Sequence, residues 1–516
     1  MLSEEKFKTL DALNEAMGTV FWNQTYTSWN EIYLMRLNVH NSNNPHLALE
    51  EKRFISESTI SFCKLQADIL RKYASSYQFI TTNGLFGHLD SHEMTDTSLD
   101  FITYDSYPNF AYDTLTDPKK PGNLNDRRYS RTLTKTRSIS PNFGIMEQQS
   151  GAGGWDSRMK QPAPKPGQMR LWTFQSIAHG ADFISYFRWR TCWIGTEIYW
   201  HGLNDYSNLP NRRLDELMVI KDDIVRLTDV AGTKYQAKIA FVKDYDNEWD
   251  GEQDKWHGPL DSYSDEGWFA AAQLCHTPMD FLYIRNSVLW KTTLEELNKY
   301  ELLIYPHATI LTEVTAALLK AYVKGGGKLI MGARTGYKDI YGRCPMRPMP
   351  GPASKICGVT VQDYTHLGPG DDEEFAVWGE DIISAPVFND ILEPMESAKV
   401  LATFKGNYYD GLPALVENRI GNGTAYYYGA GFNSETACCF LRKLEFAEPY
   451  SNIIELPQQV ELACRSGNNN AFLFILNYMP YVVDINVKKP MTELLSGIQL
   501  SGQIKLQKYG VMVFLM

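Results

Sequence analysis

The chain has 516 residues, a formal net charge of −11 and an aromatic content of 13%. At roughly 100 to 200 residues per domain, this length predicts about three domains. Lysine and arginine are not clustered, so neither a nucleic-acid surface nor an anionic-membrane surface is expected. The eight cysteines show neither a C-x-x-C pair nor a zinc-site spacing, which predicts free thiols in a reducing compartment and no bound metal or other cofactor.

The N-terminal sequence carries no apolar stretch of the kind found in secretory signals. No run approaches the roughly 18 apolar residues that a membrane-spanning helix needs. We therefore expect a cytoplasmic protein.

Residues 1–210 combine helical patterns with short apolar strands, which is typical of parallel βα units. Strands are expected, in chain order, at 78–82, 99–104, 143–147 and 182–188. Helices are expected at 52–74, 125–138 and 169–179, and the first of them has Phe62, Leu65, Ile69 and Tyr73 on one face. In such sheets the side chains just past each strand's carboxyl end form the active face.

Polar or aromatic side chains occupy all four expected strand ends. They are Asn83, the run from Asp105 to Tyr107, Glu147, and the run from Phe187 to Trp189. A lone glutamate at a strand end is more often a solvated side chain than a catalyst. Tyr107, which could hydrogen-bond a carboxylate nucleophile, and Trp155, which could wall a sugar subsite, favour a catalytic interpretation of Glu147.

Residues 211–450 begin a second α/β pattern, with a helix at 312–324 and a glycine triplet at 325–327. The triplet follows a helix and precedes a strand. Because a phosphate-binding loop has the reverse order, a helix C-cap is the better interpretation. An amidotransferase activity of this segment would need a cysteine at a strand-to-helix turn, whereas the strand at 301–305 is followed by Pro306, His307 and Ala308.

Residues 451–516 show short alternating strands at 471–476, 482–487 and 510–516, separated by Asn, Pro and Gly turns. This spacing predicts a small antiparallel β domain.

Several long motifs in the first 200 residues resemble the β-galactosidases of glycoside hydrolase family 42, and they follow the family's order. They include Thr9-Leu-Asp-Ala-Leu-Asn-Glu-Ala-Met-Gly18, Phe21-Trp-Asn-Gln-Thr-Tyr26, Tyr104-Asp-Ser-Tyr-Pro108, Ile145-Met-Glu-Gln-Gln149 and Ala178-His-Gly-Ala-Asp182. The resemblance implies an α/β fold with the C-terminal half, strands 5 to 8, of a (β/α)8 TIM barrel in residues 1–210. It further implies a flavodoxin-like or amidotransferase-like α/β trimerisation domain in 211–450 and a small antiparallel β domain in 451–516.

The same resemblance implies a homotrimer that hydrolyses terminal non-reducing β-D-galactosides with retention of configuration. Glu147 matches the family's nucleophile. The positions that match its galactose subsite are Tyr107, Trp155, Phe187, Glu197 and His201.

A retaining glycosidase also needs an acid/base carboxyl about 5 to 5.5 Å from the nucleophile. In the family this is the glutamate of an Asn-Glu pair that ends the fourth strand. The resemblance places that pair upstream of Met1, together with the cysteine cluster that binds zinc in some members. We therefore expect the chain alone to be inactive unless an upstream N-terminal fragment complements it. The alternative is a non-catalytic sugar-binding or assembly subunit.

Overall fold

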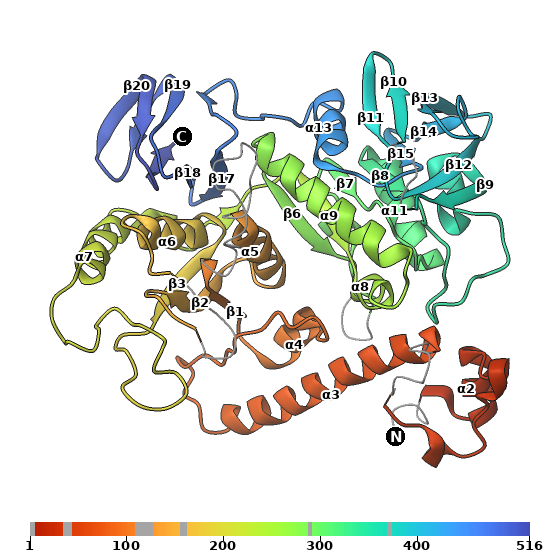
Figure 1. Ribbon diagram of the computed structural model, residues 1–516, viewed down its shortest axis with the longest axis horizontal. Helices are drawn as coiled ribbons and strands as arrows, with labels where there is room; N and C mark the ends of the chain where they lie inside the picture. The colour runs from red at the N-terminus through yellow and green to blue at the C-terminus, as the bar shows by residue number, and fades with distance from the viewer. Residues whose placement is uncertain (1–5, 35–43, 109–126, 155–161, 287–290, 369–373) are drawn as a thin grey trace.

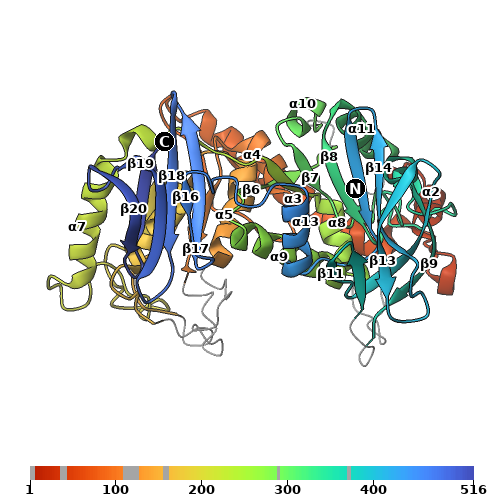
Figure 2. The same cartoon turned by 90° about the horizontal axis from the view of Figure 1, so that it is seen from above.

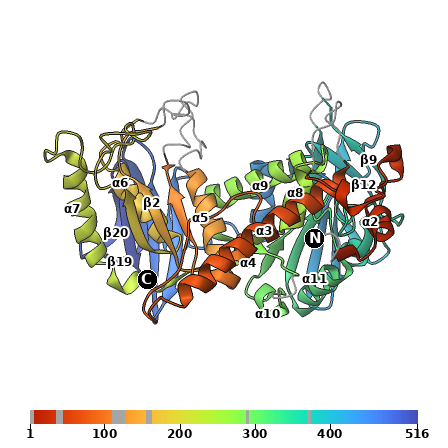
Figure 3. The same ribbon diagram turned by 90° about the horizontal axis from the view of Figure 1, so that it is seen from below.

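The computed structural model describes residues 6–34, 44–108, 127–154, 162–286, 291–368 and 374–516. Its three main β-sheets lie side by side, and the long helix α3 (Pro45–Arg71) runs along one side of the molecule (Figures 1 and 3). Short α2 (Leu10–Met17) precedes α3. None of the helices in these residues has the length and apolar character required to cross a membrane.

The first sheet is parallel and three-stranded, in the order β1-β2-β3. Its strands are β1 (Thr103–Ser106), β2 (Phe143–Gln149) and β3 (Ala181–Phe187), and its helices are α4 (Ser91–Ser98), α5 (Arg128–Ile139) and α6 (Gln168–Ala178). Helices α5 and α6 connect successive strands, as parallel pairing requires. This repeat is compatible with the C-terminal half of a (β/α)8 barrel, which the family resemblance implies.

Residues 78–82 do not form the expected strand. They run beside β1, with Asp100 N donating to Ile80 O (2.9 Å) and Thr103 N to Thr82 O (3.2 Å). However, only Asn83 makes a parallel bridge, to Thr103. An inner strand of a barrel is paired on both sides, whereas among the described residues this segment is paired on one side only.

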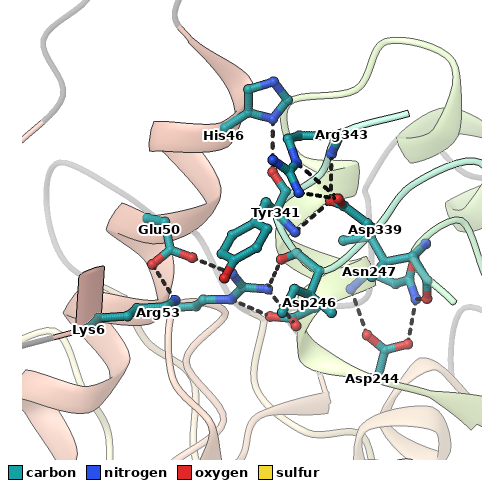
Figure 4. A network of polar contacts seen from close by, with 12 residues as sticks. Lys6, His46, Glu50, Arg53, Asp244, Asp246, Asn247, Asp339, Tyr341 and Arg343 are labelled. Carbon is teal, nitrogen blue, oxygen red and sulfur yellow. Dashed lines mark hydrogen bonds and ion pairs between the residues drawn. The ribbon is translucent and has the colours of Figure 1, made fainter. Parts of the chain in front are cut away.

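The N-terminal half of α3 is bonded to residues 246, 340 and 341, which belong to the second α/β domain of the chain (Figure 4). Arg53 donates from Nε and Nη2 to the carboxylate of Asp246 (2.8 and 2.7 Å) and from Nη2 to the carbonyl of Ile340 (2.7 Å). His46 Nδ1 lies 2.8 Å from the carbonyl oxygen of Tyr341. These contacts fix the direction in which α3 leaves that domain.

The predicted apolar face lies on the second half of α3 and, at Tyr73, just past its end, and that face is exposed. The exposed fractions are 64% for Phe62, 57% for Leu65, 47% for Ile69 and 84% for Tyr73. Within the described part of the chain, the buried residues of α3 lie elsewhere, at Ala48, Leu49, Ser56, Ile60 and Ala67.

The second sheet has nine strands in the order β11-β10-β13-β14-β15-β8-β7-β5-β6. The strands are β5 (Ile239–Lys243), β6 (Met279–Tyr283), β7 (Leu302–Ile304), β8 (Lys328–Gly332), β10 (Phe375–Trp378), β11 (Asp381–Ser384), β13 (Ala398–Lys405), β14 (Pro413–Ile420) and β15 (Gly423–Tyr428). Strands β9 (Val359–His366) and β12 (Phe388–Pro394) form a separate antiparallel pair.

Helices pack on both faces of the nine-stranded sheet (Figure 2). They are α8 (Tyr245–Gly251), α9 (His257–Leu274), α10 (Leu294–Leu297), α11 (Glu313–Gly325), α12 (Ser354–Cys357) and α13 (Ser434–Lys443). Side chains of α9 and α13 share one core cluster and those of α11 another. Helix α11 ends at Gly325, and Gly326 has φ +122°, so the predicted glycine C-cap is confirmed.

The third sheet is antiparallel, as expected for the C-terminal segment. Its strands are β4 (Lys234–Tyr235), β16 (Ile454–Glu455), β17 (Val460–Gly467), β18 (Asn470–Asn477), β19 (Val483–Glu493), β20 (Ile498–Leu506) and β21 (Val511–Leu515). Helix α7 (Arg212–Val225) precedes β4. Leu171 and Phe174 of α6 pack against Phe472 and Phe474 of β18, which joins the first and third sheets.

The buried side chain of Glu461, on β17, is hydrogen-bonded to residues from all three parts of the fold. Its Oε1 accepts from His179 Nε2 (2.9 Å) and from Gln273 Nε2 of α9 (3.1 Å). Its Oε2 accepts from the hydroxyls of Ser130 on α5 (2.8 Å) and Tyr478 (2.6 Å). A side chain 1% exposed thus receives four hydrogen bonds from residues far apart in the chain.

Candidate active site

Glu147 lies on β2 and is hydrogen-bonded by a tyrosine from the neighbouring strand's end. Tyr107, just past β1, donates from its hydroxyl to Glu147 Oε2 over 2.6 Å. Burial raises the pKa of Tyr107, and the hydrogen bond to Glu147 raises it further, so the phenol remains a donor. The contact follows from the parallel pairing of β1 and β2, which aligns their carboxyl ends.

A second carboxyl, that of Asp105, stands beside Glu147. The two residues are register partners, and register partners present their side chains to the same face of a sheet. Asn83 Nδ2 donates to Asp105 Oδ2. Burial raises the pKa of Asp105 to about 6, against the hydrogen bond from Asn83, and the charge of Glu147 adds to the rise. The sequence predicts Asp105 at a strand end, but it gave no reason to place this residue in the site.

Aromatic rings form one side of the site. Phe187, at the end of β3, and Tyr107 have ring centroids 6.3 Å apart, and both rings contact Trp200, at 6.1 and 5.2 Å respectively. Trp200 was not singled out from the sequence, because it lies in a loop without periodicity. The predicted subsite residue Trp155 lies outside the described residues.

The predicted residues Glu197 and His201 lie on the loop that follows β3. Glu197 forms an ion pair with Arg188, which itself follows Phe187. Its side chain is 38% exposed, so the carboxylate remains accessible to a ligand.

His201 is held by the carboxylate of Asp205, which was not predicted from the sequence. His201 Nδ1 lies 3.2 Å from Asp205 Oδ1, and Arg213 Nη2 donates to Asp205 Oδ2 over 3.2 Å. Burial raises the pKa of Asp205, but its hydrogen bonds outweigh burial and lower it overall. An ionised Asp205 favours the imidazole tautomer with hydrogen on Nδ1.

Glycines after β2 allow this loop to pack against the strand end that bears Glu147. A Cβ atom on Gly151 would lie 2.1 Å from the carbonyl oxygen of His201, and one on Gly153 would lie 2.8 Å from the Trp200 ring. The amide of His201 donates to the carbonyl of Ala152 over 2.9 Å. Glycine is therefore required by packing at positions 151 and 153, where the missing side chains allow Trp200 and His201 to approach the site.

The geometry brings Tyr107, Glu147, Phe187 and, through Trp200, the loop containing His201 into one cluster. A carboxylate held by a tyrosine, walled by aromatic rings and placed at the carboxyl end of a half-barrel is the arrangement of a carbohydrate-active hydrolase.

Comparison with known protein families shows which hydrolases the chain resembles. A model described as "Beta-galactosidase" of glycoside hydrolase family 42 matches residues 1–227. The family's trimerisation-domain model matches 237–448, and its C-terminal-domain model matches 459–516. The chain belongs to the family 42 β-galactosidases and is a glycoside hydrolase.

Individual relatives agree with this assignment. The chain is 31% identical over 484 residues to β-galactosidase BgaA of Clostridium cellulovorans, covering 92% of this chain and 69% of the relative. It is 28% identical to β-galactosidase LacZ of Heyndrickxia coagulans, covering 96% of this chain and 71% of that protein.

Solved structures show the same fold. A β-galactosidase from the haloarchaeon Halorubrum lacusprofundi superimposes with a TM-score of 0.83 at 27% identity, over 99% of this chain and 74% of that chain. For the enzyme from Bacillus circulans sp. alkalophilus the TM-score is 0.85 at 24% identity, over 99% of this chain and 75% of that chain.

Proposed function

We propose that the chain forms the nucleophile-bearing part of a retaining β-galactosidase that cleaves terminal non-reducing β-D-galactosides. The observation that carries the proposal is the hydrogen bond from Tyr107 to Glu147 at the carboxyl end of the half-barrel. Glu147 would attack the anomeric carbon, and the hydroxyl of Tyr107 would orient the attacking oxygen. Support also comes from the relatives, which carry the name β-galactosidase.

The surrounding side chains have roles in binding galactose. The rings of Phe187 and Trp155 would pack against the apolar face of the sugar and exclude water from the oxocarbenium-like transition state. Glu197 and His201 would hydrogen-bond the sugar hydroxyls, and the carboxylate–hydroxyl bond is charge-assisted.

The acid/base carboxyl is proposed to come from further βα units that complete the barrel. Asp105 does not meet the requirement, because it lies on the strand next to Glu147 and faces the same way. The two carboxyls of a glycosidase must instead flank the scissile bond. Such units, on a preceding segment or on another chain, would pair beside residues 78–82 and cover the apolar face of α3.

Activity measurements test both parts of this proposal. The 516-residue chain alone is expected to show negligible turnover of a nitrophenyl β-galactoside, and its complex with the completing βα units is expected to be active. Substantial turnover by the chain alone would refute the proposed division of the active site. Binding of galactose without turnover in the complex would favour the alternative, a non-catalytic sugar-binding subunit.

Replacing the nucleophile tests the role of Glu147 in the completed enzyme. Glu147→Gln is expected to lower kcat by at least about 10³-fold. Glu147→Ala with added azide is expected to yield the α-galactosyl azide, because azide attacks from the face that the nucleophile has vacated. A β-galactosyl azide would instead identify Glu147 as the acid/base and overturn the assignment.

The completed enzyme is proposed to be a homotrimer. Support comes from the match of residues 237–448 to the family's trimerisation domain. Light scattering coupled to size exclusion tests this: a mass of one subunit at micromolar concentration would contradict it.

A further inference from the structure

Two cysteines that are far apart in the sequence meet in the second domain. Cys275 directly follows α9, and Cys438 lies on α13, 163 residues later. Their Sγ atoms are 3.2 Å apart. Both residues are free thiols, with exposed fractions of 7% and 8%. The proximity results from the packing of α9 against α13 on one face of the nine-stranded sheet.

The two thiols are chemically unequal. The hydrogen bond with Cys438 lowers the pKa of Cys275, burial opposes this, and the charge of Arg442 lowers it again. The same hydrogen bond raises the pKa of Cys438, and burial raises it further. A thiolate is the reactive form of cysteine, so Cys275 is the better nucleophile and Cys438 the better resolving partner.

We propose that Cys275 and Cys438 are a redox site that closes to a reversible disulfide when the protein meets a hydroperoxide. In the first step the Cys275 thiolate attacks the peroxide. An S–O bond forms, the O–O bond breaks, and water or an alcohol leaves with the proton of the thiol.

In the second step Cys438 attacks the sulfenic sulfur of Cys275. An S–S bond forms, the S–O bond breaks, and hydroxide leaves as water with the proton of Cys438. The two thiols are oxidised by two electrons and the hydroperoxide is reduced by two.

Little movement is needed to close the bond. The sulfur atoms must approach from 3.2 Å to about 2.05 Å, within the range of a side-chain rotation. Cys439, the next residue on α13, lies about 100° farther around the helix, since an α-helix has 3.6 residues per turn. It therefore cannot replace Cys438 as the partner of Cys275.

The disulfide would lock a helix that contacts all three parts of the fold. Two residues before Cys275, Gln273 of α9 donates to Glu461 of the third sheet. On the same helix, Asp265 forms an ion pair with Arg131 on α5 of the half-barrel. Because the link closes a loop of more than 160 residues, it removes conformational freedom from the unfolded chain and is expected to stabilise the native state.

The test is oxidation of the native full chain with hydrogen peroxide, followed by alkylation, digestion without reductant and mass spectrometry. A peptide pair joined through Cys275 and Cys438, lighter than the sum of its parts by two hydrogen atoms, is expected. Dithiothreitol is expected to release it. The oxidised chain should also melt several degrees higher than the reduced chain, because one long loop has been closed.

Serine variants provide the controls. Cys275→Ser and Cys438→Ser are each expected to abolish both the linked peptide and the rise in Tm, whereas Cys439→Ser keeps both. Failure of the native wild-type chain to form the Cys275–Cys438 link, while more exposed thiols such as Cys344 are oxidised, would overturn the proposal. A link from Cys275 to Cys439, or one formed only after denaturation, would overturn it equally.

Discussion

Replacing Glu461 with glutamine is expected to loosen the junction between the three parts of the fold. The carboxylate accepts four hydrogen bonds, two on each oxygen. In Glu461→Gln one oxygen becomes an NH₂ group, which cannot accept, so two buried donors lose their acceptor. Arg137 donates to Nδ1 of His179 (2.6 Å), so His179 is a neutral imidazole whose Nε2–H points at Glu461 and cannot accept a hydrogen bond from the new amide.

The number of lost hydrogen bonds gives the size of the effect. Two lost bonds to a charged acceptor, at about 1.5 to 3 kcal/mol each, amount to about 3 to 6 kcal/mol. Burial alone would raise the pKa of Glu461, but its interactions with His179, the charge of Arg127 and the hydrogen bond from Tyr478 outweigh burial and lower the pKa from 4.5 to about 2, so Glu461 is ionised in the folded protein at neutral pH.

The pKa also fixes how the effect depends on pH. The folded-state pKa of Glu461 is depressed, so its contribution to stability is fully present above the unfolded value of 4.5 and is lost as pH falls towards about 2. The difference in unfolding free energy between wild type and Glu461→Gln is therefore expected to be about 3 to 5 kcal/mol at pH 7. It should shrink steadily below pH 4.5.

The assay is urea denaturation at several pH values, followed by circular dichroism and tryptophan fluorescence. The matched control is Glu455→Gln, the same substitution at an exposed position on β16 of the same sheet, which is expected to change stability by less than about 0.5 kcal/mol. A loss for Glu461→Gln of less than about 1 kcal/mol, or one that is unchanged between pH 7 and pH 3, would refute the reasoning.

Two further substitutions address the site and are measured in the completed enzyme. Tyr107→Phe removes the donor to Glu147 and is expected to lower kcat by about 10²-fold with a smaller change in KM; an unchanged kcat would show that the hydrogen bond has no role in catalysis. Gly151→Ala places a Cβ 2.1 Å from the His201 carbonyl oxygen, so it is expected to displace that loop and raise KM about tenfold. Gly87→Ala, where a Cβ would meet nothing within 4 Å, should leave KM unchanged, and equal effects of the two substitutions would contradict the packing argument.

Secondary structure could be predicted where the pattern that specifies it lies within a short stretch of the chain. The apolar run that ends at Glu147 predicted a strand, and β2 (Phe143–Gln149) is there. The glycine triplet predicted the end of α11, and it is there too. Residues 78–82 have the same kind of pattern but do not form a strand, and only the neighbouring Asn83 makes a bridge, because a strand needs partners as well as propensity.

The position of a candidate-site residue could be predicted where that residue lies at a strand end. The carboxyl ends of parallel strands lie at the same edge of a sheet. The positions of Tyr107, Glu147 and Phe187 along the chain therefore predict that they lie together at that edge. Trp200 and Asp205 could not, because their loop has no periodicity and its place at the site depends on tertiary packing, including that on Gly151 and Gly153.

The sequence by itself determined the three α/β and β segments, three of the four expected strands of the first segment and the family to which the chain belongs, because each of these rests on residues that are neighbours in the chain or recur at a fixed period. Tertiary structure alone decided which side chains meet across long separations. The four donors around Glu461, the thiols of Cys275 and Cys438, and the second carboxyl beside Glu147 come together only after helices and sheets have packed. These contacts form because the burial of apolar surface brings polar groups together from distant parts of the chain. Once buried, each polar group needs a hydrogen-bonding partner.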